Sequence, residues 1–210
     1  NEDVERSPPW RVVSKWLQAH VERPKGEARP LLCGYNILGF DAPIINDENK
    51  RAELEWRLDE GHILDTYLFC RWFHPEHQSR LGSMCRCYGI ELPEDRAHSA
   101  DADSAATALL TIAMVWAGYI PDDVERALSF QAEVKQKMEA DVERYGRGLY
   151  VDRSDPERLM IARGVHRGKC LFDMPPTYIQ GVVRDWKSTE LTDEARALIQ
   201  ERTKRQDELF

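Results

Sequence analysis

The sequence predicts an α/β fold, and three observations carry this prediction. Leu31–Tyr35 is a short apolar run of the kind that forms a buried strand in α/β sheets. A glycine-containing turn follows, and Asp41 stands just before Pro43, where a helix can begin. Asp103 opens an Ala/Leu-rich run with the pattern of a helix. Asp41 is therefore expected at the exit of a buried strand, where open α/β sheets place their ligands.

The helix that starts near Asp103 is expected to bury one apolar face. Four residues that follow Asp103 at helical spacing share that face: Ala106, Leu110, Ala113 and Met114. Asp103 begins this stripe, and a carboxylate at the edge of a core is costly unless it is paired or binds a cation. His98 lies five residues earlier, in the loop before the helix. A histidine beside a partly buried carboxylate suits metal-assisted hydrolysis.

The same acids also have a purely structural explanation. Aspartate at a helix N-terminus caps free backbone amides and favours the helix dipole. Asp101 fits the capping role, Asp103 fits that of a second acid in the first turn, and Asp41 fits an N-cap. Taken one at a time, these segments leave both interpretations open.

Taken together, the segments resemble the DEDDh class of 3′–5′ exonucleases, the DnaQ-like branch of the ribonuclease H-like fold. Asn36 followed by Phe40-Asp41 matches the second acidic motif of that class. The third motif is matched in register by His98, Asp103, Ser104, Ala106 and Thr107. Between the two motifs lie the family's strand ending in Asp-Thr, here Ile63–Thr66, and its helix closed by Gly-Ile, here Leu81–Ile90.

The resemblance implies a metal-dependent hydrolase that acts on single-stranded nucleic acid at its 3′ end. Asp41 and Asp103 would bind two Mg²⁺ or Mn²⁺ ions together with two further carboxylates, and His98 would be the general base. Asn36 and Phe40 are the expected substrate contacts. DNA is expected rather than RNA, because the Gly-Tyr-Asn form resembles exonuclease I-like enzymes.

The family's first acidic motif, Asp-x-Glu on the first strand of the sheet, is not found in this sequence. It should precede the amphipathic helix that begins near Trp10, but the acidic run Glu2–Glu5 lacks the apolar flanks of a central strand. We therefore expect the first three strands to lie outside these 210 residues, and the chain alone to be weak or inactive. The alternative is a non-catalytic interaction module that has lost the first motif.

Composition limits the classes of partner. A formal net charge of −8 argues against a long basic track for the nucleic-acid backbone. There is no apolar run long enough for a membrane helix, so no membrane partner is expected. The 5 cysteines are odd in number and scattered, which indicates reduced thiols in a cytoplasmic protein.

The chain is expected to divide into an exonuclease domain (1–118), a helical linker (119–150) and a small α+β domain (151–210). Gly118 and Pro121 mark the first boundary, because glycine and proline tend to end helices. The last part resembles a small domain of unknown function, of the quorum-sensing-regulated virulence factor type, that is often attached to DnaQ-like exonucleases. Its cationic loop carries His166, Arg167 and Lys169 as candidate phosphate contacts, with an ordinary basic turn as the alternative.

Overall fold

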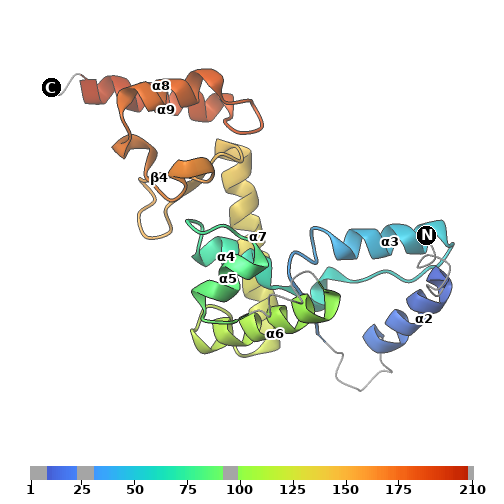
Figure 1. The fold of residues 1–210 in the computed structure, drawn as a ribbon. Helices are drawn as coiled ribbons and strands as arrows, with labels where there is room; N and C mark the ends of the chain where they lie inside the picture. The colour runs from blue at the N-terminus through green and yellow to red at the C-terminus, as the bar shows by residue number, and fades with distance from the viewer. Residues whose placement is uncertain (1–8, 23–30, 92–98, 208–210) are drawn as a thin grey trace. The chain divides into compact units, whose positions relative to one another are not determined.

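The computed structural model describes residues 9–22, 31–91 and 99–207. Within them the chain is mixed α/β, mostly helical with two small sheets (Figure 1). It forms two compact units. Unit 1 comprises Asn1–Phe69 and Met84–Gln131, and unit 2 comprises Cys70–Ser83 and Ala132–Phe210. Two helices run from one unit into the other: α4 (Thr66–Phe73) and α7 (Val124–Tyr145).

Unit 1 contains a parallel pair of strands joined by a helical crossover. The predicted strand at Leu31–Tyr35 is β1 (Leu32–Gly34), and it pairs with β2 (Ile63–Asp65). The register sets Gly34 opposite Asp65. The crossover holds α3 (Asp41–Arg51) and the short 3₁₀ helix η1 (Glu60–His62). Parallel strands need such a crossover, so this part of the chain has α/β character. The ribonuclease H-like topology itself stays a prediction.

The predicted amphipathic helix near Trp10 is α2 (Trp10–Val21), which packs beside α3 (Figure 1). A buried polar network joins the two helices. The Asn49 side-chain oxygen accepts from Trp10 Nε1 at 3.1 Å and from Ser14 Oγ at 2.8 Å. Ser14 Oγ in turn accepts from Trp56 Nε1 at 2.9 Å. Since each of these groups is satisfied, the network fixes one orientation of α2 on α3.

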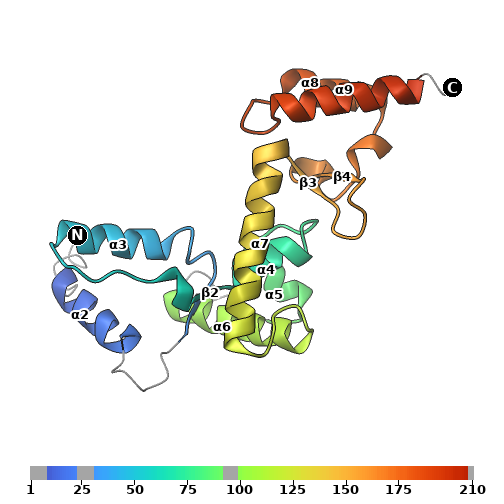
Figure 2. The ribbon, with the colours of Figure 1, turned by 180° about the vertical axis from the view of Figure 1, so that it is seen from behind.

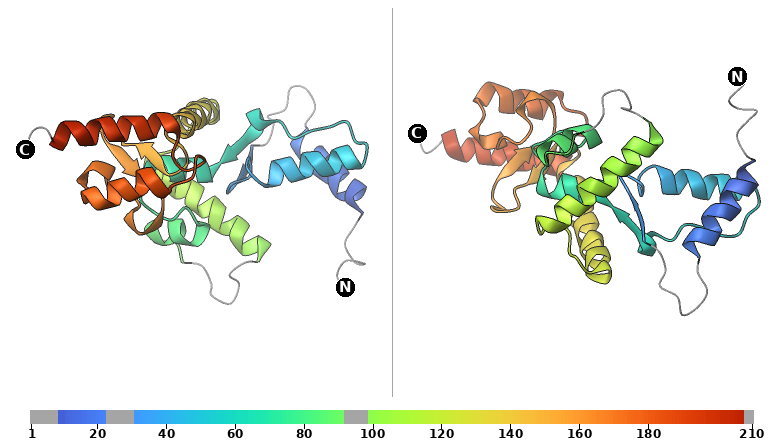
Figure 3. Two further views of the ribbon diagram at one scale, coloured as in Figure 1. Left: turned by 90° about the horizontal axis from the view of Figure 1, so that it is seen from above. Right: turned by 60° about the horizontal axis from the view of Figure 1, so that its bottom comes forward.

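The helix predicted after Asp103 is α6 (Ala100–Trp116), and it lies against β1 (Figure 3). Three of the four predicted stripe residues, Ala106, Leu110 and Met114, are buried. The helix predicted before Gly89-Ile90 is α5 (Leu81–Cys87). Gly118 follows α6 with a positive φ of 77°, which confirms the predicted end of that helix.

The outer edge of β2 is closed by a side chain rather than by another strand. Gln131 on α7 donates from Nε2 to the Ile63 carbonyl at 2.8 Å and accepts at Oε1 from the Asp65 amide at 2.6 Å. The carboxamide thus pairs with β2 much as a neighbouring peptide group would. Burial on α7 therefore does not simply follow its apolar residues: Gln131 is buried, whereas Val124 is 49% exposed.

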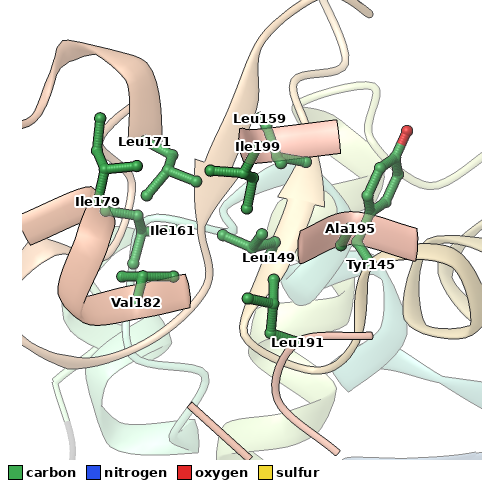
Figure 4. Packing of buried hydrophobic residues seen from close by; sticks show 10 residues of the cluster. All are labelled: Tyr145, Leu149, Leu159, Ile161, Leu171, Ile179, Val182, Leu191, Ala195 and Ile199. Carbon is green, nitrogen blue, oxygen red and sulfur yellow. The ribbon is translucent and has the colours of Figure 1, made fainter. Parts of the chain in front are cut away.

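Unit 2 contains an antiparallel hairpin covered by two helices (Figure 2). Its strands are β3 (Leu149–Val151) and β4 (Leu159–Ile161). Two 3₁₀ helices follow, η3 (Gly164–His166) and η4 (Leu171–Asp173), and then α8 (Pro176–Asp185) and α9 (Asp193–Asp207). Figure 4 shows the core, in which apolar side chains from the hairpin meet those of both helices, of η4 and of the connection between α8 and α9: Leu149, Leu159, Ile161, Leu171, Ile179, Val182, Leu191 and Ile199, with Tyr145 and Ala195 at its side.

The segment Cys70–Ser83 belongs to unit 2 because it contacts the loop after β4. Arg167 donates from Nη1 to the His77 carbonyl at 2.7 Å. Gly168 has a φ of +77°, and a Cβ built there would lie 2.6 Å from Cβ of Glu76. The positive φ and the close approach of Glu76 both favour glycine at this position.

Gly168→Ala should therefore destabilise unit 2 more than Gly164→Ala. Both glycines have positive φ, 77° and 69°, but a Cβ at Gly164 meets nothing within 4 Å. Backbone strain is thus common to both variants at about 1 kcal/mol, and the contact with Glu76 is added only at Gly168. Urea unfolding followed by circular dichroism measures the difference, and equal midpoints for the two variants would contradict the packing described.

Candidate active site

Asp41 is the first residue of α3, at the end of the connection that leaves β1. Phe40 occupies the N-cap position and Pro43 is the third helical residue, so the helix begins two residues before the predicted start. The N-cap interpretation of Asp41 is therefore wrong. The carboxylate is exposed and lies in the first turn, where it favours the helix dipole and stays accessible to a ligand.

The connection between β1 and α3 is held by Asp65, a residue that the sequence analysis did not single out as functional. Its carboxylate accepts from the backbone amide of Asn36 at 2.7 Å and from that of Leu38 at 3.1 Å. It also accepts from the amide of Tyr67 at 3.1 Å. Asp65 is 1% exposed, so these hydrogen bonds are buried. They join the turn after β1 to the end of β2. The sequence signal for Asp65 was its place in the Asp-Thr pair that ends a strand in the family that the chain resembles.

The turn itself has a tight, specific backbone. Asn36 has a φ of 63°, which belongs to the left-handed region that asparagine tolerates better than most residues. Gly39 leaves room for the Asn36 carboxamide, because a Cβ there would lie 2.6 Å from Oδ1. The two predicted substrate contacts thus differ: Asn36 is half-buried in the turn, whereas Phe40 is 61% exposed and available to a ligand.

Burial raises the pKa of Asp65 above its ordinary value of 3.8, and the negative charge of Asp41 adds to this effect. The three backbone hydrogen bonds act in the opposite direction. The Asp41 carboxylate is therefore close enough to Asp65 to be felt electrostatically. A cation bound at Asp41 would relieve this repulsion.

Asp103 lies in the first turn of α6 and is half-buried. Ser99 is the N-cap residue, so the prediction that Asp101 occupies the cap was wrong by two positions. Asp101 still serves the helix start, since a hydrogen bond with the Ser99 side chain holds the pKa of Asp101 below its ordinary value. Asp101 is exposed and Asp103 turns toward the buried face, as the stripe predicted.

The face of α6 that carries Asp103 is the face that meets the sheet. The hydroxyls of Thr107 and Thr111 follow at four-residue intervals, and each donates to the carbonyl one turn before it, at 2.8 Å in both cases. Thr111 Oγ1 lies 3.4 Å from the Cys33 sulfur of β1. At 1.5 Å per residue, Asp103 stands about 12 Å along the helix from that contact.

Asp41 and Asp103 both lie in unit 1. The helix that carries Asp41, α3, follows β1 in the chain, and the helix that carries Asp103, α6, contacts β1. His98 lies outside the described residues. Within the described part of the chain, no group of three or more His, Cys, Asp or Glu side chains is arranged to hold a metal ion. The two carboxylates offer the oxygen ligands that Mg²⁺ prefers, but they are fewer than a complete site needs.

The candidate phosphate contacts of unit 2 are largely engaged. Arg167 is bound to the His77 carbonyl, and the His166 ring lies edge-on to Tyr178 with centroids 4.8 Å apart. Lys169 is exposed. Within the described residues, no helix is both long enough and apolar enough to cross a membrane.

Comparison with known proteins gives one informative likeness. The chain is 32% identical over 80 residues to a DNA polymerase III of the PolC type from Ureaplasma parvum serovar 3. The matched stretch covers 37% of this chain and 5% of the polymerase. No protein-family profile matches the chain, and no solved structure matches it.

Proposed function

We propose that unit 1 is part of a metal-dependent 3′–5′ exonuclease of the DEDDh type, acting on DNA. The observation that carries the proposal is a pair of acidic side chains in the first turns of two helices: Asp41 on α3, the helix that follows β1, and Asp103 on α6, the helix that contacts β1. Their residue types and spacing match two motifs of one enzyme class. The partial likeness to a DNA polymerase supports the choice of substrate class.

The edges of the small sheet support the ribonuclease H-like fold as its larger context. Gln131 closes the outer edge of β2, so a further strand can add only beside β1. Two short parallel strands are not stable alone, because parallel sheets are normally covered on both faces. The outward face of α6 is also apolar: Leu109, Ile112 and Trp116 are 53%, 47% and 86% exposed. In the family that the chain resembles, three further strands, the first of which carries Asp-x-Glu, would lie beside β1.

In the proposed reaction a water oxygen attacks the terminal phosphorus and the bond to the 3′ oxygen breaks, releasing a 5′-mononucleotide. Asp41 and Asp103 would hold the metal ions, and His98 would take the proton of the attacking water. The bound ions would stabilise the charge on the attacking and leaving oxygens. Phe40 is exposed beside Asp41 and offers a surface for the terminal base.

The proposal is tested on 5′-labelled single-stranded DNA with the chain and with any longer product of its gene. We expect the longer product to give a ladder of shortened strands in Mg²⁺ or Mn²⁺, none in EDTA and none in His98→Ala, and the chain alone to give little or no shortening. Shortening that persists in EDTA, or that is equal in His98→Ala, would refute the mechanism. A longer product that binds DNA but never shortens it would favour the non-catalytic module.

A further inference from the structure

An open cavity of about 500 Å³ in unit 2 is lined by cationic side chains from two separate parts of the fold. Arg158 lies just before β4, and Arg202 and Arg205 lie one turn apart on α9. The lining side chains include three guanidinium groups against two carboxylates, Glu157 and Asp173. The cavity is thus locally cationic in a chain whose total charge is −8.

Two of the three guanidinium groups, those of Arg158 and Arg205, are paired with a carboxylate that an anion can replace at small cost. Arg158 lies 2.9 Å from Asp173, and these side chains are 46% and 67% exposed. Arg205 is bound to Glu201 on its own helix. Exposed ion pairs of this kind contribute about 0–1 kcal/mol, so exchanging a carboxylate for a phosphate costs little.

Arg202 is more firmly anchored, and it covers the aromatic ring of the cavity. It donates from Nη1 to the Glu157 carbonyl at 2.8 Å, and its guanidinium lies 5.4 Å from the Phe172 ring centroid. A flat guanidinium over an aromatic ring, next to further arginines, is the arrangement on which single-stranded nucleic acids stack their bases while their phosphates are paired.

We infer that this cavity binds the phosphates of single-stranded nucleic acid, with Arg158 and Arg205 as the phosphate contacts and Arg202 with Phe172 as the stacking surface. The inference rests on the proposed function for the choice of nucleic acid as the phosphate source. It shifts the expected phosphate contact away from the loop with His166 and Arg167, where Arg167 already bonds to His77. The new contact is the cavity lined by Arg158, just before β4, and by Arg202 and Arg205 on α9.

The test measures binding of fluorescein-labelled oligothymidylate to the full chain by anisotropy in EDTA, so that no cleavage occurs. Arg158→Ala and Arg205→Ala should each weaken binding about tenfold or more, the loss of one charge-assisted hydrogen bond. The slope of log affinity against log salt should fall by about 0.7 for each. Asp173→Asn should tighten binding, because it removes a competing carboxylate; misfolding would not produce this gain.

Arg184→Ala is the matched control, since Arg184 is an exposed arginine of the same unit, paired with Asp185 on α8 and outside the cavity. Equal weakening by Arg184→Ala, no tightening by Asp173→Asn, or no binding at about 50 mM salt would overturn the inference. Competition with thymidine monophosphate shows whether the cavity prefers the phosphate of a free nucleotide or that of a strand. Either preference supports the site.

The two proposals fail in different ways. A longer product of the gene that binds oligonucleotide through Arg158 and Arg205 but never shortens it keeps the cavity assignment and loses the exonuclease. A chain that shortens DNA while both arginine variants bind it like the wild type loses the cavity assignment alone.

Discussion

Replacing Asp65 with alanine should lower the free energy of unfolding by about 3 kcal/mol, because three backbone amides lose their acceptor in a buried place. Those amides belong to Asn36, Leu38 and Tyr67. Urea unfolding followed by circular dichroism measures the change. Asp122→Ala, which removes an exposed aspartate of the same unit, should leave the midpoint unchanged.

Asp65→Asn provides the pH test, because it keeps the shape of the side chain but cannot ionise. Burial raises the pKa of Asp65 in the folded protein above 3.8, so the folded state binds the proton more tightly than the unfolded state does. The stability that this gives is complete below 3.8 and is lost as the pH rises through the folded pKa. The wild type should therefore lose stability relative to Asp65→Asn across that window, and a gain there would be contrary to the assignment.

The second large effect is expected at the proposed metal ligands. Asp41→Asn and Asp103→Asn should each reduce metal-dependent shortening of DNA by on the order of 100-fold or more, since a neutral amide holds the cation poorly. If both residues serve one centre, the double variant should lose little beyond either single one, because groups that act as a unit are not additive. The measurement is the single-turnover rate of the longer product of the gene in Mg²⁺.

Asp101→Asn is the matched control for Asp103→Asn. Both acids lie in the first turn of α6, but Asp101 is exposed and interacts with Ser99, whereas Asp103 belongs to the buried face. A capping role alone would make the two variants alike in activity and in stability. A rate loss confined to Asp103→Asn separates the functional interpretation from the structural one.

The spacing of apolar residues predicts the buried face of α6, but it does not account for all of the buried face of α7. The α6 stripe is almost wholly apolar, so the burial of Ala106, Leu110 and Met114 follows from spacing. On α7 the buried face includes Gln131, which points inward because the edge of β2 needs a donor and an acceptor. A hydrophobic pattern does not reveal a polar residue that is buried to satisfy a strand in another part of the chain.

The candidate site was predictable where local sequence controls it. The strand before Asp41 and the helix after Asp103 both form, because their signals lie within a few residues. The role of Asp65 depends on amides some 27 to 29 residues earlier in the chain, which spacing does not predict. The contact of Arg167 with His77 likewise joins segments 90 residues apart.

A Mn²⁺ titration followed by electron paramagnetic resonance tests the shared metal centre most directly, because it counts bound ions without relying on activity. We predict that the chain binds Mn²⁺, that Asp41→Asn and Asp103→Asn each weaken this binding, and that Asp101→Asn leaves it unchanged. Equal Mn²⁺ affinity in the wild type, Asp41→Asn and Asp103→Asn would contradict the claim that these two carboxylates share a metal centre.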